Sequence, residues 1–408
     1  MTVTIADIEK AATVIADDVI RTPTVAAPGL SRVAGCDIHL KLESLQLTGS
    51  FKARGARNRL GAIDPGTTAG VIACSAGNHA QGVAYFAERM GIPATIVMPR
   101  ETPFAKVTQT ERYGAEVILE GDSFAEAQAH TADLAAARNL IFVPPYDDDL
   151  IIAGQGTAGL ELSEDAPALD TVLIPIGGGG LIAGCAIALK ARRPGLEIIG
   201  VEAASYASMQ AALAGREIAG GGTTLAEGIA VKTPGTRTLP IVRELVDDIV
   251  TVEEPAIEAA VEQMADTGGL IVEGAGAVPL AAVTGNRDRF AGRRVGLLIS
   301  GGNIDMRLYA SVLLRGLIRD GQMVRLRVRI TDAPGNLAQV SQLIGDSGGN
   351  IVEIVHQRMF YDVPVKETDI DVVVETRNAG HAAEIVEKLE TAGLPTRLLS
   401  DIAGTRSA

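Results

Sequence analysis

The sequence predicts an α/β, doubly wound fold followed by a smaller ferredoxin-like unit. From Asp37 to about Ala310, short continuous apolar runs rich in β-branched residues alternate with helical stretches, which is typical of parallel strands covered on both faces. After Gly321 the strands instead alternate polar and apolar residues, as expected for a sheet that is open on one face. At 408 residues, the chain has room for two or three domains.

Each expected element rests on its local pattern. Six apolar runs are expected as strands of the larger unit, at 71–75, 94–99, 115–120, 171–176, 197–202 and 294–300. The tail shows the order β-α-β-β-α-β, with strands at 324–330, 350–360, 368–376 and 395–400 and with helices that begin near Pro334 and span 381–392. We therefore expect a larger domain over 1–320 and a separate domain over 325–403.

Composition narrows the classes of function. The formal net charge of -14 leaves no basic surface for nucleic acid or an anionic membrane, so we expect a small-molecule ligand. Three cysteines without C-x-x-C spacing indicate neither disulfides nor a zinc site and suit a reducing cytoplasm. The N-terminus lacks the pattern of a signal peptide. Pro175 and the glycines that follow it interrupt the one long uncharged stretch, so no membrane helix is expected.

In doubly wound sheets, ligands bind beyond the carboxyl ends of the strands. Four consecutive glycines, Gly177–Gly180, lie at such a place, before a helical stretch. Their N–H groups and the positive helix end can hold a phosphate, although no P-loop lysine follows. Gly178, Gly180 and Ala183 also fit G-x-G-x-x-A, with Glu202 where a ribose-binding acid belongs, which leaves a nicotinamide-dependent oxidoreductase open.

Lys52 stands at the start of a helical stretch that reads FKARGARNRL. The positive end of the helix dipole there favours the neutral, nucleophilic amine, but a solvated surface lysine would explain this residue alone. Three further motifs follow along the chain: SAGNHAQG from Ser75, GGGGL from Gly177 and SGGN from Ser300. Together with SFKARGA, and in this order, they resemble the fold-type II pyridoxal-phosphate enzymes, specifically the threonine/serine dehydratases, over about 5–318.

The resemblance implies two doubly wound, mostly parallel sheets, with a small subdomain at about 44–147 inserted into the larger one. It implies that Lys52 is the catalytic residue and binds pyridoxal 5'-phosphate as a Schiff base. The other implied cofactor contacts are Phe51, Asn78 at the phenolic oxygen, Gly177, Gly178, Gly179, Gly180 and Leu181 at the phosphate, and Ser300 at the pyridine nitrogen. A serine there favours elimination over transamination. The implied substrate-binding residues are Ser75, Ala76, Gly77, Asn78 and His79.

The expected reaction is β-elimination and deamination of L-threonine to 2-oxobutanoate and ammonia, with L-serine giving pyruvate as a secondary activity. Serine racemases of this family carry a serine where this chain has Ala76, and a methyl group cannot transfer a proton. Racemase and hydroxyaspartate dehydratase activities remain alternatives. Some relatives bind a divalent cation through a glutamate like Glu202 and an aspartate a few residues on, but this chain has serines there, Ser205 and Ser208. No metal site is expected, although a lone carboxylate with carbonyl oxygens could hold a monovalent ion. Glu273 is expected either to line the pocket or to cap the following helix.

The C-terminal unit contains Asp332, Ala333, Pro334, Gly335, Asn336 and Leu337 between its first strand and helix. This loop resembles that of the ACT regulatory domain. The resemblance implies an amino-acid effector at Asp332, Pro334, Gly335, Asn336 and Leu337, allosteric control, a homo-oligomer and a role in amino-acid metabolism such as isoleucine biosynthesis. Two alternatives stay open: a domain that only dimerises the chain, and a non-catalytic amino-acid sensor.

Overall fold

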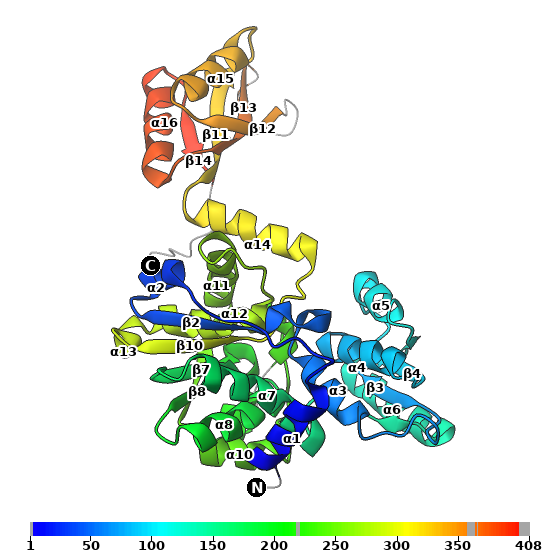
Figure 1. Ribbon diagram of the computed structural model, residues 1–408. Coiled ribbons are helices and arrows are strands. Elements are labelled where there is room, and N and C mark those ends of the chain that lie inside the picture. Colours follow the sequence, from blue (N-terminus) through cyan, green and yellow to red (C-terminus); the bar gives the residue numbers. More distant parts are fainter. Residues whose placement is uncertain (1–2, 218–220, 357–363, 365, 400–408) are drawn as a thin grey trace. The chain divides into compact units, whose positions relative to one another are not determined.

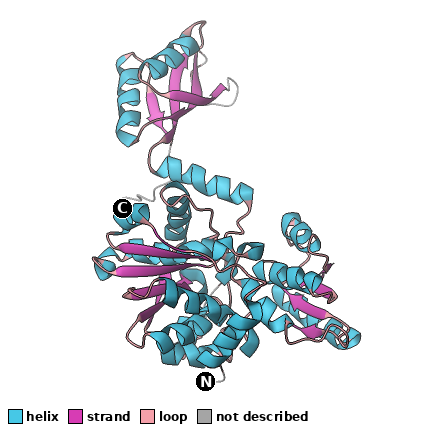
Figure 2. Cartoon of the chain, viewed as in Figure 1, coloured by secondary structure: helices cyan, strands magenta, loops and turns pink. Residues whose placement is uncertain are grey.

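The computed structural model describes residues 3–217, 221–356, 364 and 366–399. The chain forms two compact units, Met1–Ile304 and Asp305–Ala408 (Figures 1 and 2). The boundary between them precedes helix α14 (Met306–Arg319), whereas the sequence places its boundary after that helix, between 320 and 325. None of the helices in the described part of the chain is both long and apolar enough to cross a membrane.

Two sheets organise the first unit. The larger has the order β1-β2-β10-β7-β8-β9 and is parallel except for the pair β1 and β2. The smaller is parallel throughout, in the order β5-β4-β3-β6. The strands are β1 (Thr24–Ala26), β2 (Asp37–Leu42), β3 (Val71–Cys74), β4 (Ala94–Met98), β5 (Glu116–Leu119), β6 (Ile141–Phe142), β7 (Thr171–Pro175), β8 (Glu197–Ala203), β9 (Asp248–Val252) and β10 (Arg294–Ile299).

All six strands expected in this unit are present, each within one or two residues of its expected bounds. The remaining four, β1, β2, β6 and β9, were not among the apolar runs because their patterns are weak. β1 and β6 contain three and two residues, and β9 is a half-exposed strand at the sheet edge. β2 contains Lys41, which is fully buried through polar contacts rather than through apolar packing.

Helices cover both faces of the larger sheet, with α11 and α12 on one side and α7, α8 and α10 on the other (Figure 1). Local signals place several of their ends: Thr4 and Asp7 form a capping box on α1, and Asp148 caps α7. The helices are α1 (Ile5–Ile15), α2 (Pro28–Ala34), α3 (Lys52–Leu60), α4 (Asn78–Arg89), α5 (Phe104–Glu111), α6 (Phe124–Arg138), α7 (Asp149–Asp165), α8 (Gly180–Arg192), α9 (Ser208–Leu213), α10 (Thr238–Leu245), α11 (Glu254–Asp266), α12 (Gly274–Gly285) and α13 (Arg287–Phe290).

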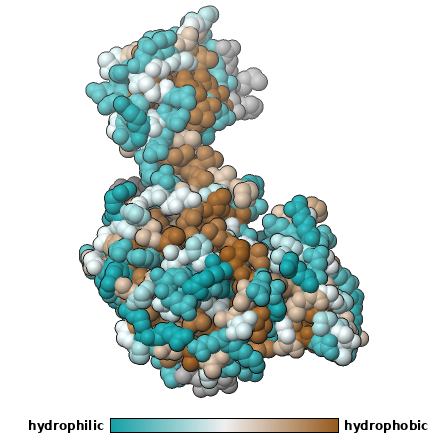
Figure 3. Space-filling model, in the orientation of Figure 1, coloured by the Kyte–Doolittle hydropathy of each residue, from teal (hydrophilic) through white to brown (hydrophobic). Residues whose placement is uncertain are grey.

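The first unit has a separate apolar core around each sheet. Helix α7 is buried along most of its length and packs against both α8 and α3, so it links the lysine-bearing helix α3 to the larger sheet. In the view of Figure 3, apolar residues gather in the middle of this unit, between α12 and α4, while hydrophilic residues dominate its rim.

The second unit confirms the expected order β-α-β-β-α-β. Its sheet is antiparallel, in the order β12-β13-β11-β14. Along β11, buried apolar residues alternate with arginines on the open face, as expected. The expected strand residues 357–360 and Ser400 lie outside the described residues. The elements after α14 are β11 (Met323–Thr331), α15 (Asn336–Asp346), β12 (Asn350–His356), β13 (Glu367–Glu375), α16 (Ala379–Thr391) and β14 (Thr396–Leu398).

Candidate active site

Lys52 is the first residue of α3, as expected, and it is partly buried. Its Nζ donates a hydrogen bond to the carbonyl oxygen of Pro145, at 2.7 Å, and lies 5.2 Å from the centre of the Phe51 ring. The neighbouring Ser50 hydroxyl is buried without a hydrogen-bond partner among the described residues. Lys52 is therefore not a solvated surface lysine.

The surroundings of Lys52 change its protonation. Removal from water lowers the pKa of its amine from 10.5 to about 8, although the negative charge of Glu273 acts in the opposite direction. At neutral pH roughly a tenth of such an amine is neutral, against less than a thousandth for an ordinary lysine. A neutral amine is both a nucleophile and a base, so this site prepares Lys52 for covalent and proton-transfer chemistry.

The glycine loop lies between β7 and α8, under the side chain of Tyr146. A Cβ atom on Gly178 would lie 2.3 Å from the Tyr146 ring, and one on Gly179, where φ is +94°, would lie 2.6 Å from Met209 Cε. The Gly178 carbonyl oxygen accepts hydrogen bonds from Thr238 Oγ1 at 2.7 Å and from the Gly235 N–H at 3.1 Å.

Only glycine therefore fits at the centre of this loop, and its backbone is held in place. The first N–H groups of α8 have no partner within the helix. They point from a buried, positively polarised helix end, which suits a phosphate group. The loop could therefore hold a phosphate group, and its role in cofactor binding stays a prediction.

Three polar side chains form a hydrogen-bonded chain beside the lysine. Asn78 Nδ2 donates to Glu273 Oε1 at 2.8 Å and to Oε2 at 3.0 Å. Asn303 Nδ2 in turn donates to Asn78 Oδ1 at 2.7 Å. Burial raises the pKa of Glu273 to about 7, against the effect of the Asn78 hydrogen bond. Glu273 occupies the N-cap position of α12, but its side chain makes no capping bond; it binds Asn78 instead.

The 75–79 loop follows β3 and is half-buried up to Asn78. Ser75 Oγ accepts a hydrogen bond from the Gly77 N–H at 3.3 Å. His79 is buried, and its Nε2 lies 2.9 Å from the Val143 carbonyl oxygen. Burial lowers the pKa of His79 to about 3, with a further contribution from the charge of Lys52, so the imidazole is neutral at physiological pH.

The four motifs meet in one place. Ser300, buried at the end of β10, accepts the Phe51 N–H through its carbonyl oxygen at 3.1 Å, and Ser50 and Gly301 form a β-bridge. Glu273 packs so closely on Gly301 that a Cβ there would lie 2.6 Å from Oε1. Leu181 is buried in the first turn of α8. Segments more than 200 residues apart thus build one site.

Sequence reasoning missed Pro145, Tyr146 and Thr238, which contact the lysine and the glycine loop. Pro145 and Tyr146 follow β6, and a two-residue strand gives little signal from which to place the loop behind it. Thr238 begins α10, about 60 residues after the glycines. No local pattern links that threonine to the loop it holds.

Glu202 is fully buried in β8. Its carboxylate accepts the N–H groups of Met209 at 2.8 Å and Gln210 at 2.9 Å, and burial raises its pKa to about 7. Because both oxygens bind the first turn of α9, this acid is not open to a ribose, which weakens the nicotinamide alternative. Within the described ranges, no three His, Cys, Asp or Glu side chains gather as a metal site would require.

In the second unit, the loop singled out by sequence connects β11 to α15. Gly335 takes φ +93° at the N-cap of the helix, and the loop is exposed from Asp332 to Gly335. Asn336 Nδ2 donates to the Thr331 carbonyl oxygen at 2.8 Å and to Thr331 Oγ1 at 2.6 Å. The side chain of Asn336 therefore fixes the shape of the turn.

Two curated proteins are similar to this chain along almost its whole length. An L-threonine ammonia-lyase of Thermotoga maritima is 41% identical over 400 residues, which cover 97% of this chain and 100% of that protein. An L-threonine ammonia-lyase of Geobacter sulfurreducens is 43% identical over 376 residues, 91% of this chain and 94% of that protein.

Solved structures show the same fold. The T.th. threonine deaminase superimposes with a TM-score of 0.71 and 40% identity, over 74% of this chain and 99% of that one. Maize serine racemase gives a TM-score of 0.73 and 33% identity, over 78% of this chain and 99% of that one. Residues 15–301 match the family described as pyridoxal-phosphate dependent enzyme. With a lysine, a glycine cradle and relatives that align along almost its whole length, the chain belongs to the fold-type II pyridoxal-phosphate dependent enzymes.

Proposed function

We propose that this enzyme is a lyase that converts L-threonine to 2-oxobutanoate and ammonia, with L-serine giving pyruvate more slowly. The observation that supports it most directly is the meeting of Lys52, the glycine loop, Asn78 and Ser300 in one buried site. Relatives that bear the name L-threonine ammonia-lyase align over 91% and 97% of the chain. The reaction removes the α-hydrogen and β-hydroxyl as water, and a second water molecule then releases ammonia.

In this proposal Lys52 attaches the cofactor and afterwards takes the α-proton of the substrate. Bound pyridoxal phosphate withdraws electrons from the α-carbon and so makes that proton acidic. The lowered pKa of Lys52 keeps a useful fraction of the amine in the basic form at neutral pH. The Pro145 carbonyl oxygen, 2.7 Å from Nζ, gives the free amine a fixed resting position.

The other residues of the site would hold the remaining parts of the cofactor. Backbone N–H groups of Gly177 to Gly180 and of Leu181 would hold the phosphate, beside the N-terminus of α8. Asn78, whose amide is held by Glu273 and Asn303, would donate to the phenolic oxygen. Ser300 would face the pyridine nitrogen, and Phe51 would pack beside the lysine. A neutral serine at that nitrogen favours loss of the β-hydroxyl over transamination.

The 75–79 loop would seat the substrate carboxylate, because it ends at the N-terminus of α4, where backbone N–H groups attract anions. Ala76 stands in this loop at the position that carries the second proton donor in the family's serine racemases. Its methyl group cannot return a proton to the opposite face of the substrate. Elimination is therefore favoured over racemisation, and racemase activity is the second candidate.

Ammonia release from L-threonine, L-serine, D-serine and 3-hydroxyaspartate, assayed in parallel, tests the substrate. We expect L-threonine to react fastest. Lys52→Ala should abolish both turnover and the yellow band that borohydride removes. Lys10→Ala, an exposed lysine on α1, is the control and should leave both unchanged. A yellow, active Lys52→Ala variant would overturn the role of the lysine, and faster reaction of 3-hydroxyaspartate would overturn the choice of substrate.

We further propose that the chain divides by function into a catalytic domain over 1–320, with a smaller subdomain at 44–147, and an ACT-type regulatory domain over 325–403. The order of elements in the second unit and the turn at Gly335 support this assignment. An amino-acid effector would bind at Asp332 to Leu337. Because that loop is exposed, a second copy of the chain would have to close the site.

A further inference from the structure

Helix α3, which begins with Lys52, packs against α7 through polar contacts. The Gly55 N–H donates to Gln155 Oε1 at 3.1 Å, and Asn58 Nδ2 donates to the Leu150 carbonyl oxygen at 2.7 Å. Gly55 approaches α7 so closely that a Cβ on Gly154 would lie 2.7 Å from its Cα atom. Hydrogen bonds are directional, so these contacts fix the rotation of the helix about its axis as well as its distance from α7.

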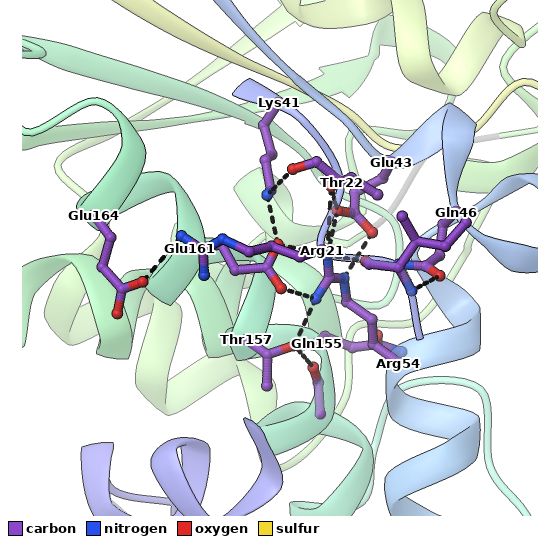
Figure 4. Close-up of polar contacts among 12 residues, drawn as sticks. Arg21, Thr22, Lys41, Glu43, Gln46, Arg54, Gln155, Thr157, Glu161 and Glu164 are labelled. Carbon is purple, nitrogen blue, oxygen red and sulfur yellow. Dashed lines mark hydrogen bonds and ion pairs between the residues drawn. The ribbon is translucent and has the colours of Figure 1, made fainter. Parts of the chain in front are cut away.

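Arg54 makes the densest of these contacts (Figure 4). Its Nε and Nη2 donate to Glu43 Oε2 and Oε1, both at 2.8 Å. Its Nη1 and Nη2 donate to Glu161 Oε1 at 2.7 Å and Oε2 at 2.8 Å. Lys41 Nζ also donates to Glu161, at 2.5 Å. Lys41, Glu43, Arg54 and Glu161 together form the buried quartet.

The buried quartet contains two cations and two carboxylates, so its formal charges cancel. The side chains of Lys41, Glu43 and Arg54 are fully buried, and that of Glu161 is 13% exposed. Burial alone would raise the pKa of Glu43, but the adjacent Arg54 outweighs it and holds that pKa below its usual value. The pKa of Arg54 is raised by the same pair, so Glu43 and Arg54 are both held in their charged forms and compensate each other.

Three elements outside α3 supply the other members of the quartet. Lys41 lies in β2, Glu43 in the short 3-10 helix Glu43–Leu45 that follows it, and Glu161 in α7. Thr157 of α7 accepts a further bond from Arg54, at 3.1 Å. The quartet thus ties the first turn of α3 to a strand, a turn and a helix at once.

Arg54 acts on a different side of α3 from Lys52. Two residues along an α-helix are about 200° apart around its axis, so the two side chains leave the helix in nearly opposite directions. Among the charges of the described residues, the one that shifts the pKa of Lys52 is Glu273, and no quartet member contributes. With the two side chains on opposite sides of α3, the route from Arg54 to Lys52 is the position of the helix.

We propose that the buried quartet positions Lys52, with Arg54 as the positioning residue that sets the place and rotation of the first turn of α3. This inference rests on the proposed role of Lys52 as the residue that attaches the cofactor and takes the proton. Small misplacement of a reacting group is enough to lower the rate strongly. Arg54 is accordingly not a catalytic residue, because it touches neither substrate nor cofactor.

The test uses Arg54→Lys, which retains the charge but loses the planar fork that binds two carboxylates. Glu161→Gln, which removes one charge from the quartet with little change in shape, serves as the second variant. Arg57→Lys is the matched control, because Arg57 lies on the same helix and pairs with Asp18 at 2.6 Å, where both side chains are only partly buried. All are prepared as full-length chains, loaded with pyridoxal phosphate for kinetics and dichroism and free of it for hydrogen exchange.

We expect Arg54→Lys to lower kcat at least about tenfold, with KM changed less than about threefold. The visible circular dichroism of the bound cofactor should weaken, and hydrogen exchange at the amides of residues 52–60 should accelerate in the cofactor-free chain. Glu161→Gln should change these readouts in the same direction. Arg57→Lys should leave kcat and the dichroism unchanged, even where it lowers the melting temperature equally.

The inference is overturned if Arg54→Lys, or Glu161→Gln where the first variant cannot be purified, keeps the dichroism and a kcat within about twofold of the parent. It is also overturned if Arg57→Lys loses as much kcat as Arg54→Lys at equal stability. Failure of the proposed function looks different, since the parent chain would then lack the yellow band or release no ammonia. Hydrogen exchange at 52–60 would still decide whether Arg54 fixes the helix.

Discussion

Two glycine turns with the same backbone conformation lie in very different surroundings. Gly179 and Gly335 each occupy the N-cap of a helix that follows a strand, at φ +94° and +93°. Around Gly179, a Cβ would collide with Met209 Cε at 2.6 Å and Thr238 Oγ1 at 2.7 Å. Around Gly335, it would meet no atom of the described residues within 4 Å.

The comparison shows that the backbone conformation of a turn does not by itself decide whether it can bind an anion; the enclosure of the turn also matters. Both turns direct the first N–H groups of a helix toward a possible anion. The turn in the first unit is enclosed by the protein itself, so it can hold a phosphate away from water, where electrostatic attraction is stronger. The turn in the second unit is open, so any ligand there needs another surface to cover it.

The largest expected effect is on cofactor affinity, and it should appear when Gly179, but not Gly335, is replaced by alanine. A left-handed alanine costs about 1–2 kcal/mol at either position. Gly179→Ala adds a collision worth about 1–3 kcal/mol and should weaken cofactor binding roughly 100-fold. Gly335→Ala should bind the cofactor normally. Titration of the cofactor-free chains, followed by absorbance, gives both affinities, and equal affinities would show that enclosure does not distinguish the two turns.

A smaller effect concerns pH and tests the enclosure of Lys52. Because its pKa is lowered to about 8, the reactive neutral amine is a minor fraction below that pH and the major form above it. The rate at which pyridoxal phosphate attaches to the cofactor-free chain should therefore rise about tenfold per pH unit up to pH 8 and then level. Stopped-flow absorbance measures this rate.

N-acetyl-lysine is the control for the pH experiment, since its rate should continue to rise toward pH 10. Glu273→Gln sharpens the test. The charge of Glu273 raises the pKa of Lys52, so its removal should shift the point of levelling to lower pH. If the rate of cofactor attachment to the chain instead keeps rising above pH 8, as it does for N-acetyl-lysine, the lowered pKa is contradicted.

The smallest effect is expected in the open turn. Asn336→Ala removes two hydrogen bonds to Thr331 at an exposed position, which should cost about 1 kcal/mol in the stability of the second unit. Activity without effector should stay unchanged, while any response to amino-acid effectors should weaken. Thermal unfolding and assays with a panel of amino acids measure both.

Asn350→Ala is the matched control in the same unit, because Asn350 donates an exposed bond to Glu375 Oε2 at 3.0 Å, away from the turn. It should lower stability to a similar degree and leave the response intact. A response that survives Asn336→Ala would place the effector elsewhere or show that the unit has none.

Much of the fold could be predicted because its signals are local. The six apolar runs gave the long strands of the first unit, and alternation gave the open sheet of the second. The strands that escaped prediction are short, exposed or, in β2, interrupted by a buried lysine. For such strands the surrounding structure, and not the residue pattern, decides the conformation.

Patterns along the chain were enough to place the glycine loop, Lys52 at a helix start and the order of elements in the second unit, because each depends on sequence neighbours. Folding in three dimensions was needed to establish that Tyr146 covers Gly178, that Glu273 binds Asn78, and that Arg54 joins Glu43 and Glu161. Most of these contacts join residues that are far apart in the chain, so packing and burial create them. The sequence predicted a neutral amine at Lys52 from its place at a helix start, but the burial that lowers the pKa of Lys52 and raises that of Glu273 comes from the tertiary structure.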